Sequence, residues 1–381
     1  MRRRYVTSLA VLAAFAALPG LATAQSFTPT VEIHGFGTWL YGQTTNDNNY
    51  LAGTKEGNYG SENFELNLST QVNDRLRITL QPSWDADGLG EETQTGMSYA
   101  FASWRLNDEA SLRIGQVKHP FGLYTETIDV GTLRPFLDVP QAVYGGTGFV
   151  GEAYRGLGIG GSHSVGSWTL DYDFYGGAMG ILERAGQIDY FLGVTDLPEG
   201  TEVEQTRNVL GTRLVGRTPI AGLSFGGSWY RGTLVGGAVE TPRWVGAGQL
   251  EYLNGPVSFR SEFAHETSRE TDGERMLVNG GYTELGYRLG THWQVAGRYQ
   301  KLRTDMPDNN VSAAPSLMNH EESNVGLNYW FADNFVIKAQ YAGVTGNRYA
   351  APDVTTMRQQ IAAGTLNKRT HLVMIGAQVH F

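Results

Sequence analysis

The residues most able to interact with a solute or substrate are arginines, lysines and carboxylates that alternate with apolar residues along short segments of the sequence. In an extended chain, successive side chains point to opposite faces, so each such segment has one apolar and one polar face. Basic residues occupy the polar faces near the middle of their segments at Arg77, Arg113, Arg213, Arg260, Arg298 and Lys338. Rings of Arg or Lys around an aqueous path favour anions, and rings of acids favour cations. The pattern therefore indicates electrostatic filtering rather than bond-making chemistry.

A second group of charged residues lies in one long connection, residues 118–152: Lys118, Glu126, Asp129, Arg134 and Asp138. A stretch of this length without secondary structure of its own is usually functional. It also carries an apolar group that needs a surface to pack against: Phe121, Leu123, Leu133, Phe136, Leu137 and Val143. We expect the connection to fold into a wide barrel and narrow it. Gly156, Gly158 and Gly160, on one face of the next segment, would leave a groove for it. The alternative is an outward loop that caps the mouth or contacts a neighbouring subunit.

Motifs for catalysis, cofactors and metals are weak in this sequence. Gly156-x-Gly158-x-x-Gly161 matches the dinucleotide pattern in letters, but a strand and a turn follow it instead of a helix. No nucleophile-elbow pattern accompanies the Ser, His and Asp residues. The Asn/Asp clusters at 46–49 and 305–310 do not fit the calcium-binding loop and are typical of turns. We expect no catalytic residue, no cofactor and no metal site.

The elements that must position the charged residues are β-strands. The chain ends on an apolar row at alternate positions: Val373, Ile375, Ala377, Val379 and Phe381. A strand whose apolar face runs to its last residue suits a barrel strand that meets lipid on one face and water on the other. The same alternation occurs near 31–42, 62–72, 75–84, 168–174 and 335–341.

Loop lengths alternate as well. Short turns are expected at 73–74, 107–109, 163–166, 219–222, 254–255, 289–291 and 332–334. Longer polar connections fall near 43–61, 85–95, 118–152, 177–205, 232–241, 267–274, 304–320 and 345–367. Together they join about sixteen strands in an all-β, antiparallel up-and-down transmembrane barrel, with residues 118–152 as its third extracellular loop. A barrel of ~16–18 strands leaves an aqueous channel. Aromatic residues near the segment ends predict girdles at the two lipid–water boundaries: Trp39, Trp84, Trp104, Trp229 and Trp293.

The first 24 residues are predicted to be a signal peptide. Arg2, Arg3 and Arg4 form a positive region, residues 6–18 an apolar region, and Ala22-Thr23-Ala24 a cleavage site. Cleavage removes three of the 29 basic residues and leaves 26 against 38 acidic ones, a balance that argues against nucleic acid as a partner. The chain has no cysteine for disulfides. Residues 25–381 contain no apolar run long enough for a membrane helix and no linker, which predicts one barrel domain.

The run from Leu112 to Leu123, a strand of Gly and basic residues that enters Pro120-Phe121-Gly122 at the third loop, resembles Gram-negative outer-membrane porins. It is most similar to the broad phosphate-selective porin O and P family. The resemblance implies a third loop that forms the constriction and a homotrimer. It also implies that the terminal Phe381 is recognised by the barrel assembly machinery. Phosphate-selective members line the constriction with many Lys, whereas residues 25–381 hold only Lys55, Lys118, Lys301, Lys338 and Lys368.

These features predict an outer-membrane porin for passive diffusion of small hydrophilic solutes, with a weak preference for anions. Its expected surroundings are outer-membrane lipid and lipopolysaccharide. Three alternatives stay open: a phosphate- or anion-selective porin, a non-conducting barrel that hydrolyses lipid or binds partners, and a soluble periplasmic β-protein. The charged residues could also be solvated lumen groups with no effect on selectivity.

Overall fold

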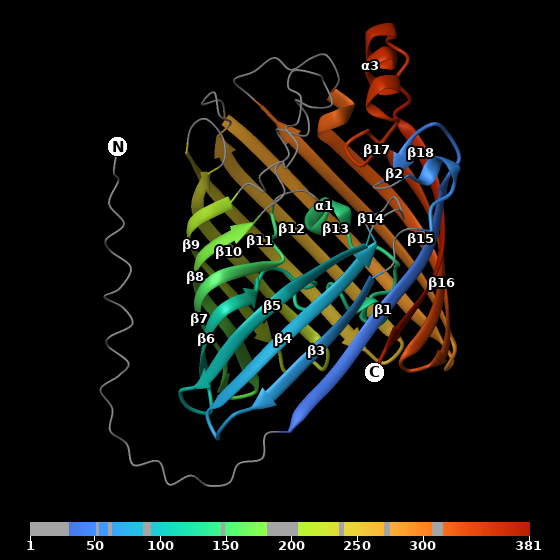
Figure 1. The fold of residues 1–381 in the computed structure, drawn as a ribbon. Coiled ribbons are helices and arrows are strands. Elements are labelled where there is room, and N and C mark those ends of the chain that lie inside the picture. Colours follow the sequence, from blue (N-terminus) through green and yellow to red (C-terminus); the bar gives the residue numbers. More distant parts are fainter. Residues whose placement is uncertain are drawn as a thin grey trace.

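Alternating side chains and tight turns produce a closed antiparallel barrel of sixteen strands (Figure 1). The computed structural model describes residues 30–50, 53–59, 63–86, 93–145, 149–180, 205–235, 240–269, 275–306 and 315–381. The barrel strands are β1 (Val31–Thr44), β3 (Asn63–Gln71), β4 (Leu76–Ala86), β5 (Thr93–Arg105), β6 (Ala110–Lys118), β7 (Ala153–Val165), β8 (Trp168–Gly180), β9 (Gln205–Arg217), β10 (Leu223–Val235), β11 (Thr241–Asn254), β12 (Val257–Arg269), β13 (Arg275–Leu289), β14 (Trp293–Asp305), β15 (Asn319–Ala332), β16 (Phe335–Thr345) and β18 (Arg369–His380). The predicted fold class and strand number are confirmed.

Each barrel strand pairs with the barrel strands before and after it in the chain, and β1 pairs with β18 to close the cylinder. Closure leaves no edge strand with unpaired backbone groups, which is the condition for crossing hydrocarbon with strands. Two short strands outside the barrel, β2 (Asn49–Tyr50) and β17 (Ala350–Ala351), pair with each other and link the first and last long connections.

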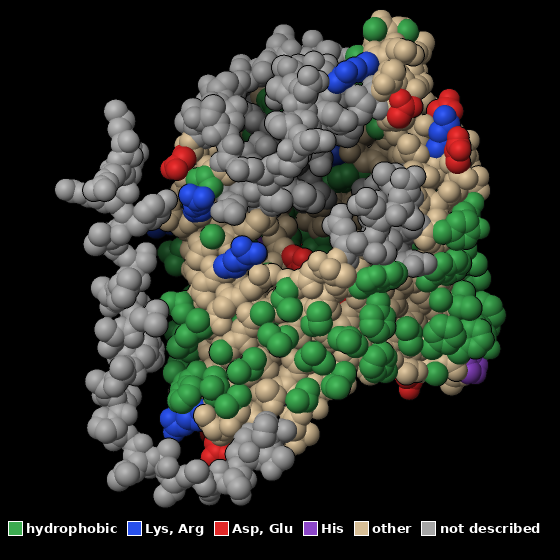
Figure 2. All heavy atoms as spheres, in the orientation of Figure 1, with side chains coloured by type: hydrophobic (Ala, Val, Ile, Leu, Met, Phe, Trp, Pro, Cys, Tyr) green, Lys and Arg blue, Asp and Glu red, His purple; other side chains and the backbone are tan. Residues whose placement is uncertain are grey.

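The outer face is apolar and the inner face polar, as the alternation predicts. In β18 the outward Val373, Ile375 and Val379 are 49%, 45% and 38% exposed, and Phe381 is 56% exposed. In β16 Ile337 and Tyr341 are exposed, whereas the intervening Lys338 and Gln340 are buried. Figure 2 shows apolar side chains as a band across the visible face of the wall, with charged side chains above and below it.

The two ends of the barrel differ. At one end strands are joined by short turns, for example at residues 73–74 and 255–256; the other end carries the longer connections. Those connections contain the 3₁₀ helices η2 (Thr54–Glu56) and η4 (Pro315–Met318) and the helix α3 (Val354–Ala363). Strand β7 continues to Val165, so the turn expected at 163–166 lies at 166–167. Within the described ranges, no helix is both long and apolar enough to cross a bilayer.

The connection between β6 and β7, residues 119–152, is here called L3. It contains η3 (Gly131–Leu133) and the short helix α1 (Gln141–Tyr144), so it does have some secondary structure of its own. Helix α1 contacts β12, β13 and β14 and is seen within the outline of the barrel in Figure 1. L3 therefore lies against strands that are far from it in sequence.

A charge placed on the outer face should destabilise the barrel. Val325 lies at the centre of β15, is 60% exposed, and pairs with Gly297 and Tyr341. We expect Val325→Arg to lower the free energy of unfolding in lipid vesicles by about 2–4 kcal/mol, because the charge would meet hydrocarbon at the bilayer centre. Urea titration followed by heat-modifiable electrophoretic mobility measures this loss. Thr79→Arg, on the inner face of β4, is the control and should cost much less; equal losses would contradict the assignment of the two faces.

Candidate functional site: the lumen and L3

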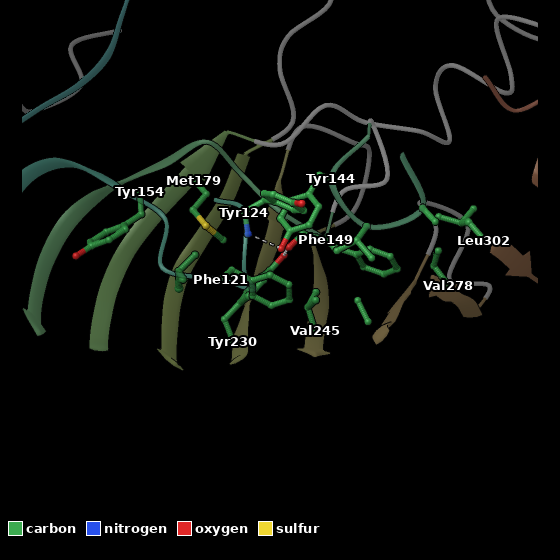
Figure 3. Close-up of a cluster of buried hydrophobic side chains, with 14 of the residues drawn as sticks. Phe121, Tyr124, Tyr144, Phe149, Tyr154, Met179, Tyr230, Val245, Val278 and Leu302 are labelled. Carbon is green, nitrogen blue, oxygen red and sulfur yellow. Dashed lines mark hydrogen bonds between the residues drawn. The ribbon is translucent and has the colours of Figure 1, made fainter. Parts of the chain in front are cut away.

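L3 packs on the inner wall of the barrel through an apolar cluster. Phe121, Tyr124, Val143 and Phe149 are at most 2% exposed and lie against wall residues (Figure 3). The wall contributes Tyr175, Val209, Tyr230, Val245, Val278 and Leu302. Burial of this apolar surface stabilises L3 on the wall.

Two details of the packing differ from those that the sequence predicts. Leu133 was grouped with the packing residues, but it is 50% exposed, unlike its neighbours Gly131 and Thr132 in η3, which are buried. The glycines of β7 do not provide a groove for L3. The space beside Gly158 is taken by the Tyr154 hydroxyl, and the space beside Gly160 by Asp173 and Arg113. Side chains of the strands themselves fill these positions.

The first anchor of L3 is Glu262 on β12. Its carboxylate accepts hydrogen bonds from the hydroxyls of Tyr144 (2.5 Å) and Tyr282 (2.6 Å) and from the backbone N–H of Leu123 (2.8 Å). Gly122 has φ +66°, and a Cβ there would lie 2.5 Å from the same carboxylate. Burial raises the pKa of Tyr144 well above its ordinary value, so its hydroxyl remains a donor. The Pro-Phe-Gly sequence thus makes a tight bend on a buried carboxylate.

The second anchor is Lys338 on β16. Its Nζ donates to the backbone carbonyls of Gly131 (2.9 Å), Arg134 (2.5 Å) and Phe136 (3.4 Å), and the residue is 1% exposed. Lys338 was expected to face the water-filled lumen, but L3 covers it. A neighbouring residue of β16 also binds L3: the Gln340 side chain accepts a hydrogen bond from the backbone N–H of Leu137 at 2.9 Å.

Arg298 and Arg134 are covered in the same way. The Arg298 side chain is fully buried, donates to Asp138 at 2.8 Å, and has Glu284 within 3.6 Å. Its guanidinium lies 4.5 Å from the centre of the Phe136 ring. Arg134 donates to the carbonyls of Ile128 and Leu137 within L3. These two arginines hold L3 in shape and are not open to the channel.

The remaining predicted cations of the channel region are ion-paired. Arg113 lies 3.3 Å from Asp173, and Arg213 contacts both Asp173 and Glu126, at 3.2 Å and 3.0 Å. Arg260 pairs with Glu251 at 2.7 Å, with Glu284 at 3.7 Å, and lies over the Tyr124 ring. Lys118 pairs with Asp129. The ion pairs fall into three separate groups along L3: Arg113, Arg213, Asp173 and Glu126; Arg260, Arg298, Glu251, Glu284 and Asp138; and Lys118 with Asp129.

Arg77 lies apart from these ion pairs. Its register partner in β3 is Gln71, the last residue of β3 before the turn at 73–74, and it pairs with Glu32 near the start of β1. Arg77 therefore sits near the short-turn end instead of beside L3. The position of a side chain along the barrel axis depends on the residue at which its strand begins, and alternation does not determine that residue.

Sequence reasoning missed several inward acids. Glu251, Glu266, Glu284 and Glu322 all lie on the inward faces of their strands. The alternation itself could have found them, since Glu284 follows Tyr282 by two residues on the inward face of β13. Arg243, paired with Glu266 at 2.8 Å, and Arg217, paired with Asp171 at 2.6 Å, were also missed.

An open space remains beside these ion pairs. A cavity of about 440 Å³ lies between L3 and the wall and is lined by Gly122, Glu126, Arg213, Arg217, Asp171 and Glu251, among others. The Arg217 side chain is 68% exposed. The cavity is thus polar, with charges of both signs in contact with water. Among the residues that the structure describes, no group of His, Asp and Glu is arranged to hold a metal ion.

Comparison with solved structures shows that outer-membrane channels share this fold. The match to a solved outer-membrane channel, DcaP of Acinetobacter baumannii, has a TM-score of 0.61 at 12% identity and covers 93% of this chain and 97% of that one. An anion-selective porin from Comamonas acidovorans gives 0.58 at 10% identity, covering 93% and 100%. OmpT of Vibrio cholerae gives 0.55 at 11% identity, covering 94% and 99%. At these identities the likeness establishes the porin fold.

The family comparison adds a relationship in sequence. Residues 233–381, from the end of β10 to the C-terminus, match the family model of phosphate-selective porin O and P. No curated protein matches the chain. The chain therefore has the fold of outer-membrane porins and, over residues 233–381, is related in sequence to the phosphate-selective porin O and P family. The family suggested by residues 112–123 is thus the one that matches, through the C-terminal part of the chain.

The Lys338 anchor can be tested directly. Lys338→Met would leave buried carbonyls of L3 without a donor, at about 1–3 kcal/mol for each unsatisfied group. We expect amide hydrogen exchange of residues 131–137 to accelerate by about tenfold or more. Lys301→Met, on the outer face of β14, is the matched control and should leave these amides unchanged. Unchanged exchange in Lys338→Met would show that Lys338 does not hold L3.

His119 should make L3 sensitive to acid. It is fully buried, its Nε2 lies 2.7 Å from the Tyr175 hydroxyl, and burial lowers its pKa from 6.5 to about 3. The neutral form is therefore preferred in the folded state, and the stability that this provides is complete above pH 6.5 and is lost as the pH falls toward 3. We expect hydrogen exchange of residues 119–125 to accelerate over this range, and His119→Gln to flatten the dependence. His163→Gln, half exposed at the other end of the barrel, is the control; an unchanged slope in His119→Gln would contradict the assignment.

Proposed function

We propose that this chain is a passive diffusion porin for small hydrophilic solutes, in which L3 sets the size limit. The observation that carries the proposal is the attachment of L3 to the inner wall of a sixteen-strand barrel by Glu262, Lys338 and Arg298. A barrel of this size without an inward segment is a wide aqueous channel. An inward segment held by buried contacts would reduce the cross-section of that channel.

Ion pairing supports weak selectivity. Arg113, Arg213, Arg260 and Lys118 each have a carboxylate partner within 4 Å, so their fields are largely cancelled at the distance of a passing ion. A free ring of lysines, which would favour phosphate, has no counterpart here. Of the two lysines near L3, Lys118 is paired with Asp129 and Lys338 is buried under backbone carbonyls. We therefore favour a general pore over a phosphate-specific one, with at most a weak preference for anions.

The related expectations belong to the same proposal. Residues 1–24 act as a cleaved signal peptide, and residues 25–381 form the barrel. The Vibrio cholerae OmpT structures include a trimer form, and we propose a homotrimer for this chain. Phe381, exposed at the end of β18, is proposed as the signal for the barrel assembly machinery. No catalytic residue and no cofactor are assigned.

Conductance tests the pore and its size limit together. We expect the folded protein to conduct in planar bilayers and to admit small sugars in liposome swelling assays. Deletion of residues 125–148 should raise the conductance severalfold, since it removes the part of L3 that crosses the lumen. Arg213→Ala should shift the reversal potential toward cations, because Glu126 and Asp173 would then lack one of their partners.

The outcomes separate the alternatives. A folded protein that never conducts, before or after the deletion, would overturn the porin and favour a binding or enzymatic barrel. Lipid hydrolysis that disappears on replacing a single Ser would favour the enzyme. A wild type that strongly prefers anions, with Arg213→Ala unchanged, would favour a phosphate- or anion-selective channel governed by other residues.

A further inference from the structure

The cavity between L3 and the wall lies on the short-turn side of L3. Thr218 and Gly222, in the turn between β9 and β10, belong to its lining. Gly122 and Leu123 line it from L3. Its volume of about 440 Å³ is within the ~300–1,000 Å³ that is usual for small-molecule sites. A solute that moves between L3 and this mouth of the barrel therefore meets a space large enough to hold it.

Strand register places a cation and a carboxylate of the lining on either side of a small residue. Arg217 of β9 pairs with Ser224 of β10, and Ser224 pairs with Glu251 of β11. Since neighbouring strands lie roughly 4.8 Å apart, the Cα atoms of Arg217 and Glu251 are about 10 Å apart. Between them Ser224 offers only a short side chain with a hydroxyl. The wall of the cavity therefore has opposite charges with room between them.

Each of these two charges is held from the side away from Ser224 and keeps spare hydrogen-bonding capacity. The Arg217 Nε donates to Asp171 of β8 at 2.6 Å, and the Glu251 Oε2 accepts from Arg260 of β12 at 2.7 Å. Neither Arg217 nor Glu251 forms a further side-chain hydrogen bond with the described part of the chain. The terminal nitrogens of Arg217 therefore remain able to bind a carboxylate, and the Oε1 of Glu251 to accept from a donor.

Gln249, two residues before Glu251 on the inward face of β11, is a buried polar group without a partner. It lines the cavity and is 8% exposed, and its Oε1 has no hydrogen-bond donor among the residues that the structure describes. A buried acceptor left unpaired is costly, so such a group needs an explanation, and a bound donor provides one. Rotation about the last side-chain bond exchanges this oxygen with the amide nitrogen, so the amide can present an acceptor to the cavity when a donor occupies it.

The charges of the lining favour a ligand that carries both signs. Two cations and three carboxylates line the cavity: Arg213, Arg217, Glu126, Asp171 and Glu251. With Arg260, the partner of Glu251, the balance is three against three. A solute with a single charge of either sign would meet charges of its own sign here. A solute with one charge of each sign can place each beside an opposite charge.

We propose that this cavity binds a small zwitterion that has an ammonium and a carboxylate group, such as a free α-amino acid. The carboxylate binds the terminal nitrogens of Arg217, which can form two parallel hydrogen bonds with it. The ammonium group donates to the Oε1 of Glu251 and to the amide oxygen of Gln249. This inference rests on the proposed function and narrows it, since it names a solute class that the pore holds on the short-turn side of L3.

Direct binding tests the site on the full-length folded protein in neutral detergent. The probes are L-alanine, propionate, which lacks the ammonium group, and ethylamine, which lacks the carboxylate, each titrated by saturation-transfer NMR. We expect alanine to bind about tenfold more tightly than either analogue, because each analogue loses one charge-assisted contact. Arg217→Gln, Glu251→Gln and Gln249→Met should each weaken alanine binding about tenfold. Arg105→Gln, on the inward face of β5 and outside the cavity, is the matched control and should leave the binding unchanged.

Equal binding of alanine, propionate and ethylamine by wild type would overturn the zwitterion site, as would unchanged alanine binding in Arg217→Gln and Gln249→Met. The comparison of the three solutes uses wild type alone, so it decides the proposal even if a variant fails to fold.

Flux into proteoliposomes separates this site from the pore itself. Labelled alanine should enter through wild type at a rate that saturates with concentration, whereas uncharged glycerol should enter at a rate that rises linearly. A protein that passes glycerol but does not bind alanine would retain the pore and overturn the site. A protein that binds alanine but passes neither solute would retain the site and overturn the pore.

Discussion

The structure depends on closure of the sheet between its first and last strands. Inside hydrocarbon a backbone N–H or C=O without a partner costs several kcal/mol, so an open sheet edge cannot be exposed there. β18 meets β1 in continuous register from Phe36 opposite His380 to Thr44 opposite Leu372. The seam extends to the final residue, since Phe381 donates its N–H to Gly35 at 2.8 Å and accepts from Gly35 at 3.0 Å. Truncation of even this residue would remove hydrogen bonds at the point where the cylinder closes.

Once the cylinder is closed, the inner wall imposes its own requirement on charge. L3 covers part of the wall, and every cation beneath it needs a partner, because an unpaired buried charge is far more costly than a paired one. Arg298 has Asp138 and Glu284, while Lys338 has three carbonyl groups of L3. Arg298 and Lys338, which alternation predicts to face the pore, therefore bind L3 instead. Among the charges left in contact with water is Arg217, which lines the cavity between L3 and the wall with its partner Asp171.

On the outer wall, charged side chains are separated from the apolar rows instead of being buried in ion pairs. Its outward rows are mostly apolar, and in β14 the outward basic residues Lys301 and Arg303 come after the exposed Tyr299, toward the end of the strand. The two faces of one strand can therefore follow different rules. In β14, Arg298 faces inward and is fully buried, while Lys301 and Arg303 face outward at the rim. Strand alternation makes this separation possible within a few residues of sequence.

The sequence by itself determined the properties that repeat locally. Alternation with a period of two identified the strands, the outward row that ends at Phe381, and the inward direction of Arg113, Arg213 and Arg260. Turn residues and loop lengths gave sixteen strands and a long third connection. Only the tertiary structure decided which inward charges remain open to water, because that depends on contacts between distant residues. Tyr124 donates to Glu284, 160 residues away, and Lys338 holds Gly131, 207 residues away. The position of Arg77 along the barrel axis and the exposure of Leu133 could not be predicted either. Alternation indicates which face of the sheet a side chain occupies, but it gives neither its position along the barrel axis nor the residues that pack over it.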